Sequence, residues 1–266
     1  MIIEGLKKLE YRGYDSFGIA TMESGITIEK HQGRISANAV SVAGLIGKTG
    51  IGHTRWATHG VPSDENAHPH IDCSGKIAIV HNGIIENYAG LRRQLETLGH
   101  TFRSETDTEV IVHLIEDEYS TTHNLLTAVT AVLPQLKGSY AILVIAERED
   151  TIIAARNASP LVIGIGDGEF FIASDITPML EHTEQVVFLE DGDIASLTRT
   201  KLEIFKDRVP VTRPVEMIDW SVEDVKKGGF SHYMLKEIYE QPQAFYNTVR
   251  GISKNKLAEI IKIPER

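Results

Sequence analysis

Apolar positions recur with two different periods along this chain, and the two periods separate expected strands from expected helices. Short runs rich in β-branched residues and bounded by turn residues predict strands. These runs are Phe17 to Met22, Ile26 to Lys30, Gly50 to Thr54, Lys76 to His81, Ala141 to Glu147, Thr151 to Ala155, Leu161 to Ile165 and Glu169 to Ala173. Apolar positions at helical spacing occur in Met1 to Glu10, Ile85 to Leu98, Glu109 to Glu118 and Leu125 to Leu136.

The connections between the expected strands indicate antiparallel sheets. Arg148 to Asp150 and the Asp167-Gly168 pair are long enough for a hairpin but too short for a parallel crossover. The run from Ala141 to Ala146 is apolar on both faces, which is typical of a sheet covered on both sides. We therefore predict an α+β fold in which two stacked antiparallel sheets lie between helices.

Composition narrows the class of protein. With 266 residues and 42% hydrophobic content, the chain can bury a substantial core in water. The formal net charge of -10, with no run of Lys or Arg longer than a pair, excludes nucleic acid and anionic membranes as expected partners. No apolar run approaches the length of a membrane span. The single cysteine cannot form an internal disulfide, so a reduced, cytoplasmic setting is expected.

The segment His53 to Gly60 follows an expected strand and contains Arg55 and Trp56. A guanidinium offers a planar fork of donors suited to a carboxylate, and an indole can shield such a pair from water. The segment therefore suits the binding of a small anion. A surface loop with an incidental arginine explains the composition equally well.

The dipeptide Asn82-Gly83 follows the strand Lys76 to His81 and precedes the helix expected near Ile85. An amide side chain beside a glycine N–H can supply two converging donors to an oxyanion. A turn with a helix N-cap is the structural alternative, because Asn-Gly pairs commonly form turns.

The acidic segment Ser104 to Glu109 precedes an apolar helix. Thr106 and Glu109 have the spacing of a capping box, which accounts for most of the acidity structurally. Asp107 is the residue that this interpretation leaves to face a ligand, and its carboxylate could bind an ammonium group.

The histidines between His53 and His81 lack the helical i, i+4 spacing of a zinc motif, so we expect packing and hydrogen-bonding roles and no metal. Gly164, Gly166 and Gly168 lack the dinucleotide-binding spacing and predict a hairpin turn. The sequence predicts no cofactor.

Several ordered segments together resemble the glutaminase half of the glutamine–fructose-6-phosphate aminotransferase family. The resemblance extends from the first residues to a motif that is similar to the family's passage from glutaminase to sugar isomerase. The segments are Tyr11 to Ser16, His53 to Gly60, Asn66 to His70, His81 to Asn87, Ser104 to Glu109 and Lys236 to Pro242.

The resemblance implies an N-terminal-nucleophile hydrolase fold of four layers, αββα, and a glutaminase that supplies ammonia for glucosamine 6-phosphate synthesis. It implies a glutaminase domain over 1–212, a linker over 213–242 and the start of a sugar isomerase domain over 243–266. The expected partners are L-glutamine, a sugar isomerase domain in the same or a separate chain, and a second copy in a homodimer.

The family pattern also assigns residue roles. It matches Arg55 to the α-carboxylate of glutamine and Asp107 to its α-amino group, while Asn82 and the Gly83 N–H match the oxyanion hole. The remaining matches are to a loop that closes over glutamine and to a segment that supports the nucleophile. The closing loop contains Trp56, Thr58 and His59, and the supporting segment contains Arg12 and Gly13.

The family's nucleophile is an N-terminal cysteine whose own amine is the general base. The opening Met1 to Leu6 resembles the middle of the family's first helix, so the cysteine and the first strand are expected to be missing. Cys73 matches no family motif and is interpreted as incidental. We expect the chain as written to bind glutamine without hydrolysing it, through truncation rather than degeneration. A degenerate binding module and the glutaminase of another class II amidotransferase are the alternatives.

Overall fold

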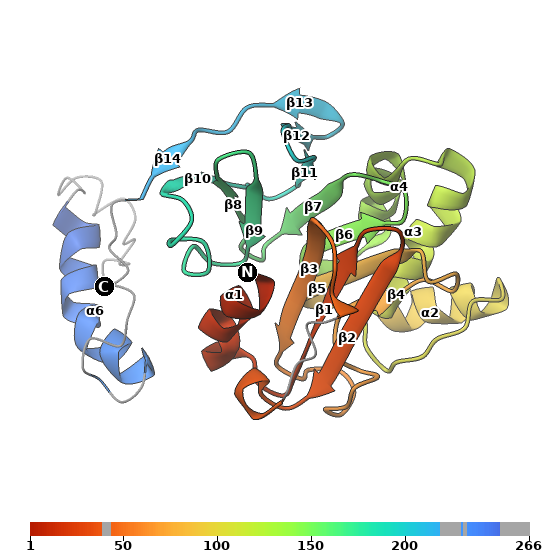
Figure 1. Cartoon of the computed structure of the whole chain (residues 1–266), viewed down its shortest axis with the longest axis horizontal. Coiled ribbons are helices and arrows are strands. Elements are labelled where there is room, and N and C mark those ends of the chain that lie inside the picture. The colour runs from red at the N-terminus through yellow and green to blue at the C-terminus, as the bar shows by residue number, and fades with distance from the viewer. Residues whose placement is uncertain (39–43, 219–229, 231–232, 251–266) are drawn as a thin grey trace, which may run out of the picture. The chain divides into compact units, whose positions relative to one another are not determined.

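The computed structural model describes residues 1–38, 44–218, 230 and 233–250. The chain divides into two units, Met1–Asp219 and Trp220–Arg266. In the first unit, strands and helices form layers, shown in Figure 1. The second unit contains the helix α6 (Tyr233–Arg250). Among the described residues, no helix combines the length and apolar character needed to cross a membrane.

The largest layer is a seven-stranded sheet in the order β13-β12-β11-β7-β6-β5-β4, with antiparallel pairing throughout. Its strands are β4 (His70–Ile71), β5 (Ile77–Ile85), β6 (Gly138–Ala146), β7 (Ile152–Asn157), β11 (Asp193–Leu197), β12 (Leu202–Lys206) and β13 (Val209–Val211). The tight β6–β7 connection, which the sequence predicted to be a hairpin, joins neighbouring antiparallel strands.

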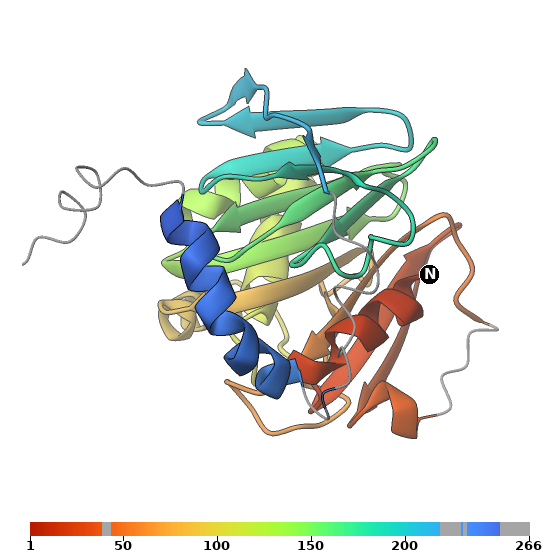
Figure 2. The ribbon, with the colours of Figure 1, turned by 90° about the vertical axis from the view of Figure 1, so that its left-hand side faces the viewer.

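Three helices cover one face of this sheet, as Figure 2 shows. They are α2 (Tyr88–Thr97), α3 (Glu109–Thr122) and α4 (Leu125–Val132). Helix α3 buries Val110, Ile111, Leu114 and Ile115, whose spacing forms one helical face. Ile142 of β6 belongs to the same core cluster as these residues.

Two smaller sheets pack against the other face. One has the order β2-β1-β3, and the other has the order β14-β10-β8-β9. Their strands are β1 (Ser16–Met22), β2 (Ile26–Gln32), β3 (Thr49–Arg55), β8 (Val162–Ile165), β9 (Phe170–Ala173), β10 (Gln185–Phe188) and β14 (Glu216–Met217). Ile145 joins the core cluster of the three-stranded sheet, whereas Ala141 joins that of the four-stranded sheet. Leu143 packs against both clusters, so β6 contacts both small sheets.

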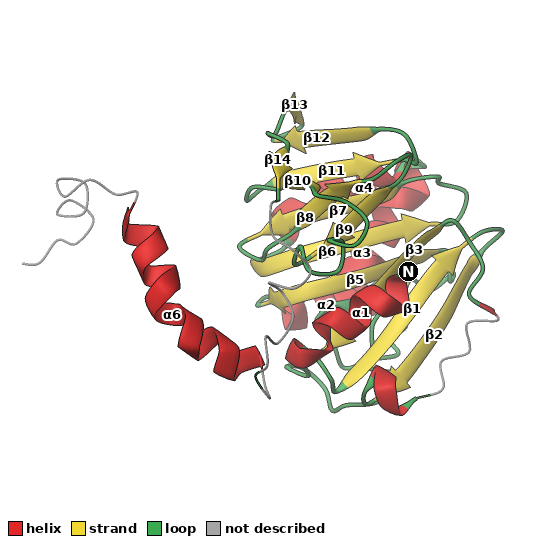
Figure 3. Cartoon of the chain, turned by 60° about the vertical axis from the view of Figure 1, so that its left-hand side comes forward, coloured by secondary structure: helices red, strands yellow, loops and turns green. Residues whose placement is uncertain are grey.

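The outer layer over the three-stranded sheet is the helix α1 (Ile2–Leu9), which lies across β3 in Figure 3. Gly50 and Gly52 permit this close packing. A Cβ atom at Gly52 would lie 2.7 Å from a methyl carbon of Ile2 and 3.0 Å from one of Leu6. The layers therefore run helices, seven-stranded sheet, two smaller sheets and helix. This confirms the predicted α+β fold of four layers.

The sequence-based boundary between β5 and the next helix is wrong. The strand was expected to end at His81 and the helix to begin near Ile85. Instead, β5 continues to Ile85 and α2 begins at Tyr88. Pairing with β6 extends the strand, because Asn82 lies opposite Ala141. The sequence analysis also missed β4 and the strands from β10 to β14, which are short or lie late in the chain.

The first unit extends past the expected boundary at residue 212. Arg213 donates hydrogen bonds of 2.8 and 2.7 Å to the buried Asp193 carboxylate, and Glu216 of β14 pairs with Val186. The expected limit between linker and isomerase segment, at residue 242, falls within α6. Residues 219–229, 231–232 and 251–266 of those expected segments lie outside the described residues, so the domain assignments remain predictions.

Candidate functional site

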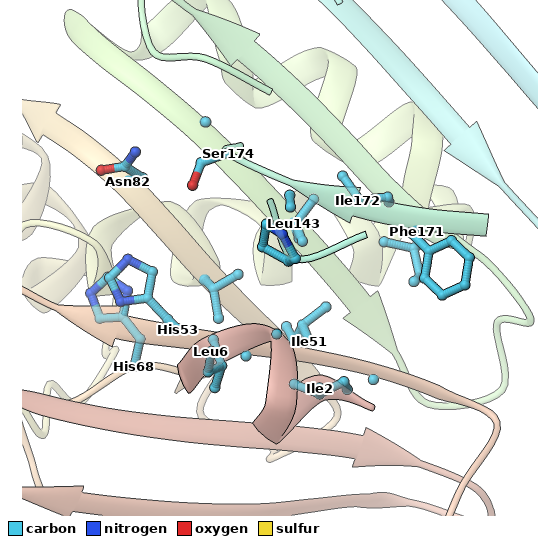
Figure 4. Close-up of a pocket in the computed structure, with 18 of the residues that line it drawn as sticks. Ile2, Leu6, Ile51, His53, His68, Asn82, Leu143, Phe171, Ile172 and Ser174 are labelled. Atoms are coloured by element: carbon cyan, nitrogen blue, oxygen red, sulfur yellow. The ribbon is translucent and has the colours of Figure 1, made fainter. Parts of the chain in front are cut away.

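A cavity of about 1080 Å³ lies among α1, β3, β5, β6 and β9. Figure 4 shows a polar end with Asn82, Ser174, His53 and His68. It also shows an apolar region whose labelled residues are Ile2, Leu6, Ile51, Leu143, Phe171 and Ile172. The strands β3 and β9, which each end the strand order of their own sheet, both contribute lining residues.

Most of the residues singled out in the sequence line this cavity. Their contributing segments lie far apart in the chain, and the fold brings them together. The lining residues are Arg12, Arg55, Trp56, Thr58, His59, Asn82, Gly83 and Asp107. Gly13 packs behind the lining, where a Cβ atom would lie 2.6 Å from the Thr54 carbonyl oxygen. Arg12 donates a 2.9 Å hydrogen bond to the Ser174 hydroxyl, which connects the opening segment to the end of β9.

Arg55 ends β3 and is 4% exposed. Its guanidinium donates hydrogen bonds to the carbonyl oxygens of His59, Gly60 and Val61, with the Gly60 bond at 3.1 Å and the Val61 bond at 3.4 Å. Burial lowers the pKa of Arg55, and the carboxylates of Asp15 and Asp107 oppose that effect. The guanidinium therefore stays charged beside the cavity and fixes the loop that follows it.

The loop from Trp56 to Val61 is also held by two residues that the sequence analysis did not assign. The Asp15 carboxylate accepts a 2.8 Å hydrogen bond from the Ala57 N–H, and the Asn66 amide donates one of 3.0 Å to the Val61 carbonyl. Both residues lie in segments that carried the family resemblance, which was the available sequence signal. Trp56 itself is 59% exposed, with its ring centroid 5.6 Å from that of Tyr14.

Asp107 is a buried carboxylate just before α3. Its Oδ2 accepts a 2.7 Å hydrogen bond from the Ile85 N–H at the end of β5. Its Oδ1 lies 3.7 Å from Nδ1 of His59, which is beyond hydrogen-bond range. The Ile85 N–H therefore holds one carboxylate oxygen of Asp107 in place. The negative charge of Asp107 lies on the lining of the same cavity as the positive charge of Arg55.

Asn82 and Gly83 lie inside β5, opposite Ala141 and Tyr140 of β6. The alternative interpretation of this pair as a turn with a helix N-cap is therefore wrong. Gly83 has φ of 144°, and a Cβ atom there would lie 2.1 Å from the Ser139 carbonyl oxygen. The position requires glycine, and Asn82 at the polar end of the cavity is exposed.

Three buried histidines, His68, His70 and His81, and the partly buried His53 pack beside the polar end. Nδ1 of His81 lies 2.9 Å from the Thr108 hydroxyl, which is also 3.3 Å from Nε2 of His68. Nε2 of His70 lies 3.1 Å from the Thr106 hydroxyl. These contacts agree with the packing and hydrogen-bonding roles expected from the sequence, and they hold the segment around Asp107.

Burial is the main cause of the low pKa values of these histidines. Burial lowers the pKa of His53 to about 3, with smaller effects from His81 and Arg55. The pKa values of His68 and His70 are lowered well below the ordinary value for the same principal reason. Burial lowers the pKa of His81 too, although the Asp107 carboxylate opposes the change. The cluster is therefore uncharged near neutral pH.

The expected capping box at α3 is wrong. Thr108 is the N-cap residue and makes no side-chain capping bond, while Thr106 contacts His70 and Ser104. The Glu109 carboxylate reaches back to the N–H groups of Arg103 and Ser104, at 2.8 and 2.7 Å. Burial alone would raise the pKa of Glu109, but its hydrogen-bond donors lower it to about 2.

Comparison with known proteins assigns residues 53–194 to the family of the glutamine amidotransferase domain. The chain is 51% identical to glutamine–fructose-6-phosphate aminotransferase (isomerizing) from Thermus thermophilus over 94% of its length. It is also 51% identical to the protein of that name from Acinetobacter baylyi over 97% of its length. It spans 42% and 43% of those two proteins, which is less than half of either.

A solved structure of glutamine phosphoribosylpyrophosphate amidotransferase from B. subtilis shares the fold. Its TM-score is 0.63 at 28% identity, and the match covers 82% of this chain and 46% of that one. A structure described as the allosteric regulatory enzyme of purine biosynthesis also has a TM-score of 0.63, at 29% identity, over 84% of this chain and 47% of that one. The four-layer arrangement is therefore shared with amidotransferases.

Proposed function

The chain belongs to the glutamine amidotransferase domain family, and on that premise we propose that its cavity binds L-glutamine. We propose further that the domain serves a protein that transfers the amide nitrogen of glutamine to fructose 6-phosphate, yielding glucosamine 6-phosphate. The sequence similarity to glutamine–fructose-6-phosphate aminotransferases supports the choice of acceptor.

The observation that carries the proposal is the presence of Arg55, Asp107 and Asn82 in the lining of one cavity. An α-amino acid carries a carboxylate, an ammonium group and, in glutamine, a side-chain amide. A guanidinium suits the carboxylate and a buried carboxylate suits the ammonium group. These two charges would orient the ligand so that its amide reaches Asn82 and Gly83 at β5.

The chemistry proposed for the family's reaction begins when a thiolate attacks the side-chain amide carbon of glutamine. The carbonyl oxygen becomes an oxyanion, and Asn82 with the Gly83 N–H would stabilise that charge. Collapse expels ammonia, with a proton supplied by the nucleophile's own terminal amine, and leaves a γ-glutamyl thioester. Water then releases glutamate and restores the thiol.

The residues of this sequence supply the proposed pocket but no thiol within it. Cys73 is the only cysteine and is absent from the cavity lining. The chain from Met1 to Arg266 is therefore expected to bind glutamine and to release no ammonia. Trp56, Thr58 and His59 would close over the bound ligand and exclude water from it.

In the proposed full enzyme, the domain works with a sugar isomerase domain and as a homodimer. A glutaminase serving another acceptor is the second candidate function. The fold is shared with a phosphoribosylpyrophosphate amidotransferase at 28% identity, whereas the match to aminotransferases of fructose 6-phosphate reaches 51%. The higher identity favours fructose 6-phosphate as the acceptor.

Calorimetry with L-glutamine tests the binding role directly. We expect saturable binding by the parent chain and at least about tenfold weaker binding by Arg55→Lys and by Asp107→Asn. The lysine loses the planar fork of donors that fits a carboxylate, and the asparagine loses the negative charge that attracts the ammonium group. Arg93→Ala, at an exposed position of α2 outside the cavity lining, is the matched control and should bind as the parent does.

The parent and Asp107→Asn proteins also test the proposed contact between Asp107 and the ammonium group of the ligand. N-acetylglutamine, which lacks the ammonium group, should bind weakly to the parent, and Asp107→Asn should change its affinity little. Absence of heat with glutamine in a folded parent chain would overturn the binding role. Release of ammonia by the parent chain would contradict the expectation that it binds without turnover.

A further inference from the structure

Four side chains that the proposed glutamine site does not use lie together beside α3. They are Cys73, His100, His113 and Glu116, and their potential ligand atoms all lie within 4.8 Å of one another. Cys73 comes from the turn between β4 and β5, and His100 from the segment after α2. The other two lie on α3 at positions i and i+3, which face the same side of a helix.

Four of the six separations among these atoms are close to those of tetrahedral coordination. Cys73 Sγ lies 3.6 Å from His100 Nδ1 and 3.7 Å from His113 Nδ1. Glu116 Oε2 lies 3.2 Å from each of the same two ring nitrogens. Around Zn²⁺ with ordinary bond lengths, a sulfur and a nitrogen are about 3.5 Å apart, and a nitrogen and an oxygen about 3.3 Å apart. The other two separations are no longer than 4.8 Å, and their shortening would bring the four side chains to one ion.

The far nitrogens of both imidazoles face carboxylates. His100 Nε2 lies 2.9 Å from Asp117 Oδ1, within hydrogen-bond range. His113 Nε2 lies 3.7 Å from Glu109 Oε1 and makes no hydrogen bond. A carboxylate that accepts the Nε2 proton of a histidine fixes the tautomer whose Nδ1 carries a free lone pair. His100 with Asp117 has this arrangement, in which a carboxylate orients a metal-binding histidine.

If both imidazoles carry their proton on Nε2, acceptors outnumber donors in the cluster. The two Nδ1 lone pairs and the Glu116 carboxylate converge, while the Cys73 thiol is the only side-chain donor among them. The Cys73 N–H already donates to Glu116 Oε2 at 3.1 Å, which uses one oxygen lone pair. A cation at the centre would satisfy the remaining lone pairs. Protonation of both imidazoles is the competing explanation.

We propose that Cys73, His100, His113 and Glu116 form a binding site for Zn²⁺. A thiolate, two imidazoles and a carboxylate are ligand types that this borderline-soft ion accepts. On binding, the Cys73 thiol loses its proton to the solvent and a Zn–S bond forms. The ion would connect the β4–β5 turn, the segment after α2 and the helix α3. The proposal gives Cys73 a role, whereas the sequence interpretation took it as incidental.

The site is open to titration from solvent, because Cys73 is exposed. His113, on the inner side of the site, is buried. The test uses the purified chain without an added histidine tag. Zn²⁺ is titrated against a chromophoric chelator, and Co²⁺ is used as a spectroscopic probe of thiolate ligation. We expect one ion per chain and a sulfur-to-cobalt charge-transfer band in the near ultraviolet.

Cys73→Ser and His100→Asn should each bind Zn²⁺ at least about tenfold more weakly, and Cys73→Ser should lose the charge-transfer band. Asp117→Asn should weaken binding but keep the band, because Asp117 positions His100 and does not contact the ion. His123→Asn, an exposed position at the end of the same helix, is the matched control and should bind as the parent does.

Circular dichroism verifies that each variant is folded. Zn²⁺ affinity that is equal in the parent, Cys73→Ser and His100→Asn would overturn the proposal. A cobalt spectrum that Cys73→Ser leaves unchanged would do the same. Because no measurement involves glutamine, these outcomes are independent of the proposed function.

Discussion

Gly83 shows how strongly a single position can be constrained at this site. Its φ of 144° lies in a region that side chains with a Cβ atom avoid, and the neighbouring Ser139 carbonyl leaves no room for one. The conformation persists because pairing with β6 holds the strand on both sides of it. The same residue is the one proposed to offer its N–H to the oxyanion.

Replacement of Gly83 by alanine should therefore cost more than about 2 kcal/mol of folding free energy, through backbone strain and contact with Ser139. Gly90→Ala, in α2, is the control, because no atom would contact its Cβ and alanine favours helices. Urea unfolding measures both. A Gly83→Ala protein as stable as the parent would refute the steric account.

At the scale of elements, β3, β5 and the segment before α3 meet through the cluster of His53, His68, His70 and His81. His53 lies on β3 and His81 on β5, and their neighbours His68 and His70 contact the threonines on either side of Asp107. The neutral imidazoles thus support the residues proposed to bind glutamine. Charging them would place positive charge beside Arg55 in a dry region.

The pH dependence of stability follows from this arrangement. The folded-state pKa values lie below the ordinary value of about 6.5, so the unfolded chain binds more protons, and stability is fully present above that pH. It is lost as the pH falls from about 6.5 toward about 3, the value for His53. We expect the urea concentration at the unfolding midpoint to be lower at pH 5.5 than at pH 7.5.

His70→Gln isolates the contribution of one of these groups. The amide can still bond to the Thr106 hydroxyl, but it does not titrate. Its unfolding free energy should therefore change less between the two pH values than that of the parent. An identical change in the two proteins would contradict burial as the source of the pH dependence.

On the scale of the whole molecule, β6 holds the layers together. Its alternate residues contact the helical layer on one face and the two smaller sheets on the other. The cavity that contains the residues proposed to bind glutamine is lined by elements of the two smaller sheets, the seven-stranded sheet and α1. Correct packing of the two β layers is therefore a condition for assembling the site.

Ile145→Ala tests this packing, because Ile145 is fully buried and contacts the core beneath the three-stranded sheet. We expect a loss of about 2 to 5 kcal/mol, from lost burial and the remaining void. Leu98→Ala, at a residue that is 65% exposed, should change stability by less than about 0.5 kcal/mol. Similar losses for the two variants would mean that the layers are not coupled as described.

The sequence by itself determined the fold class and most of the elements. Short runs rich in β-branched residues and bounded by turn residues located β1, β2, β3 and the strands from β6 to β9, because this signal depends on neighbours in the chain. The family resemblance selected Arg55, Asp107 and Asn82, and their presence in one cavity agrees with that selection. Their individual roles remain predictions.

Only the tertiary structure decided the features that depend on distant partners. Asn82 and Gly83 belong to a strand because they pair with β6. Thr106 contacts His70 and does not form the capping box that its spacing predicts. The meeting of Cys73 with His100 and His113 likewise joins segments that no local pattern relates. Hydrogen bonds and ligand clusters form between residues that are close in space, whereas periodicity reports only which side of an element each residue faces.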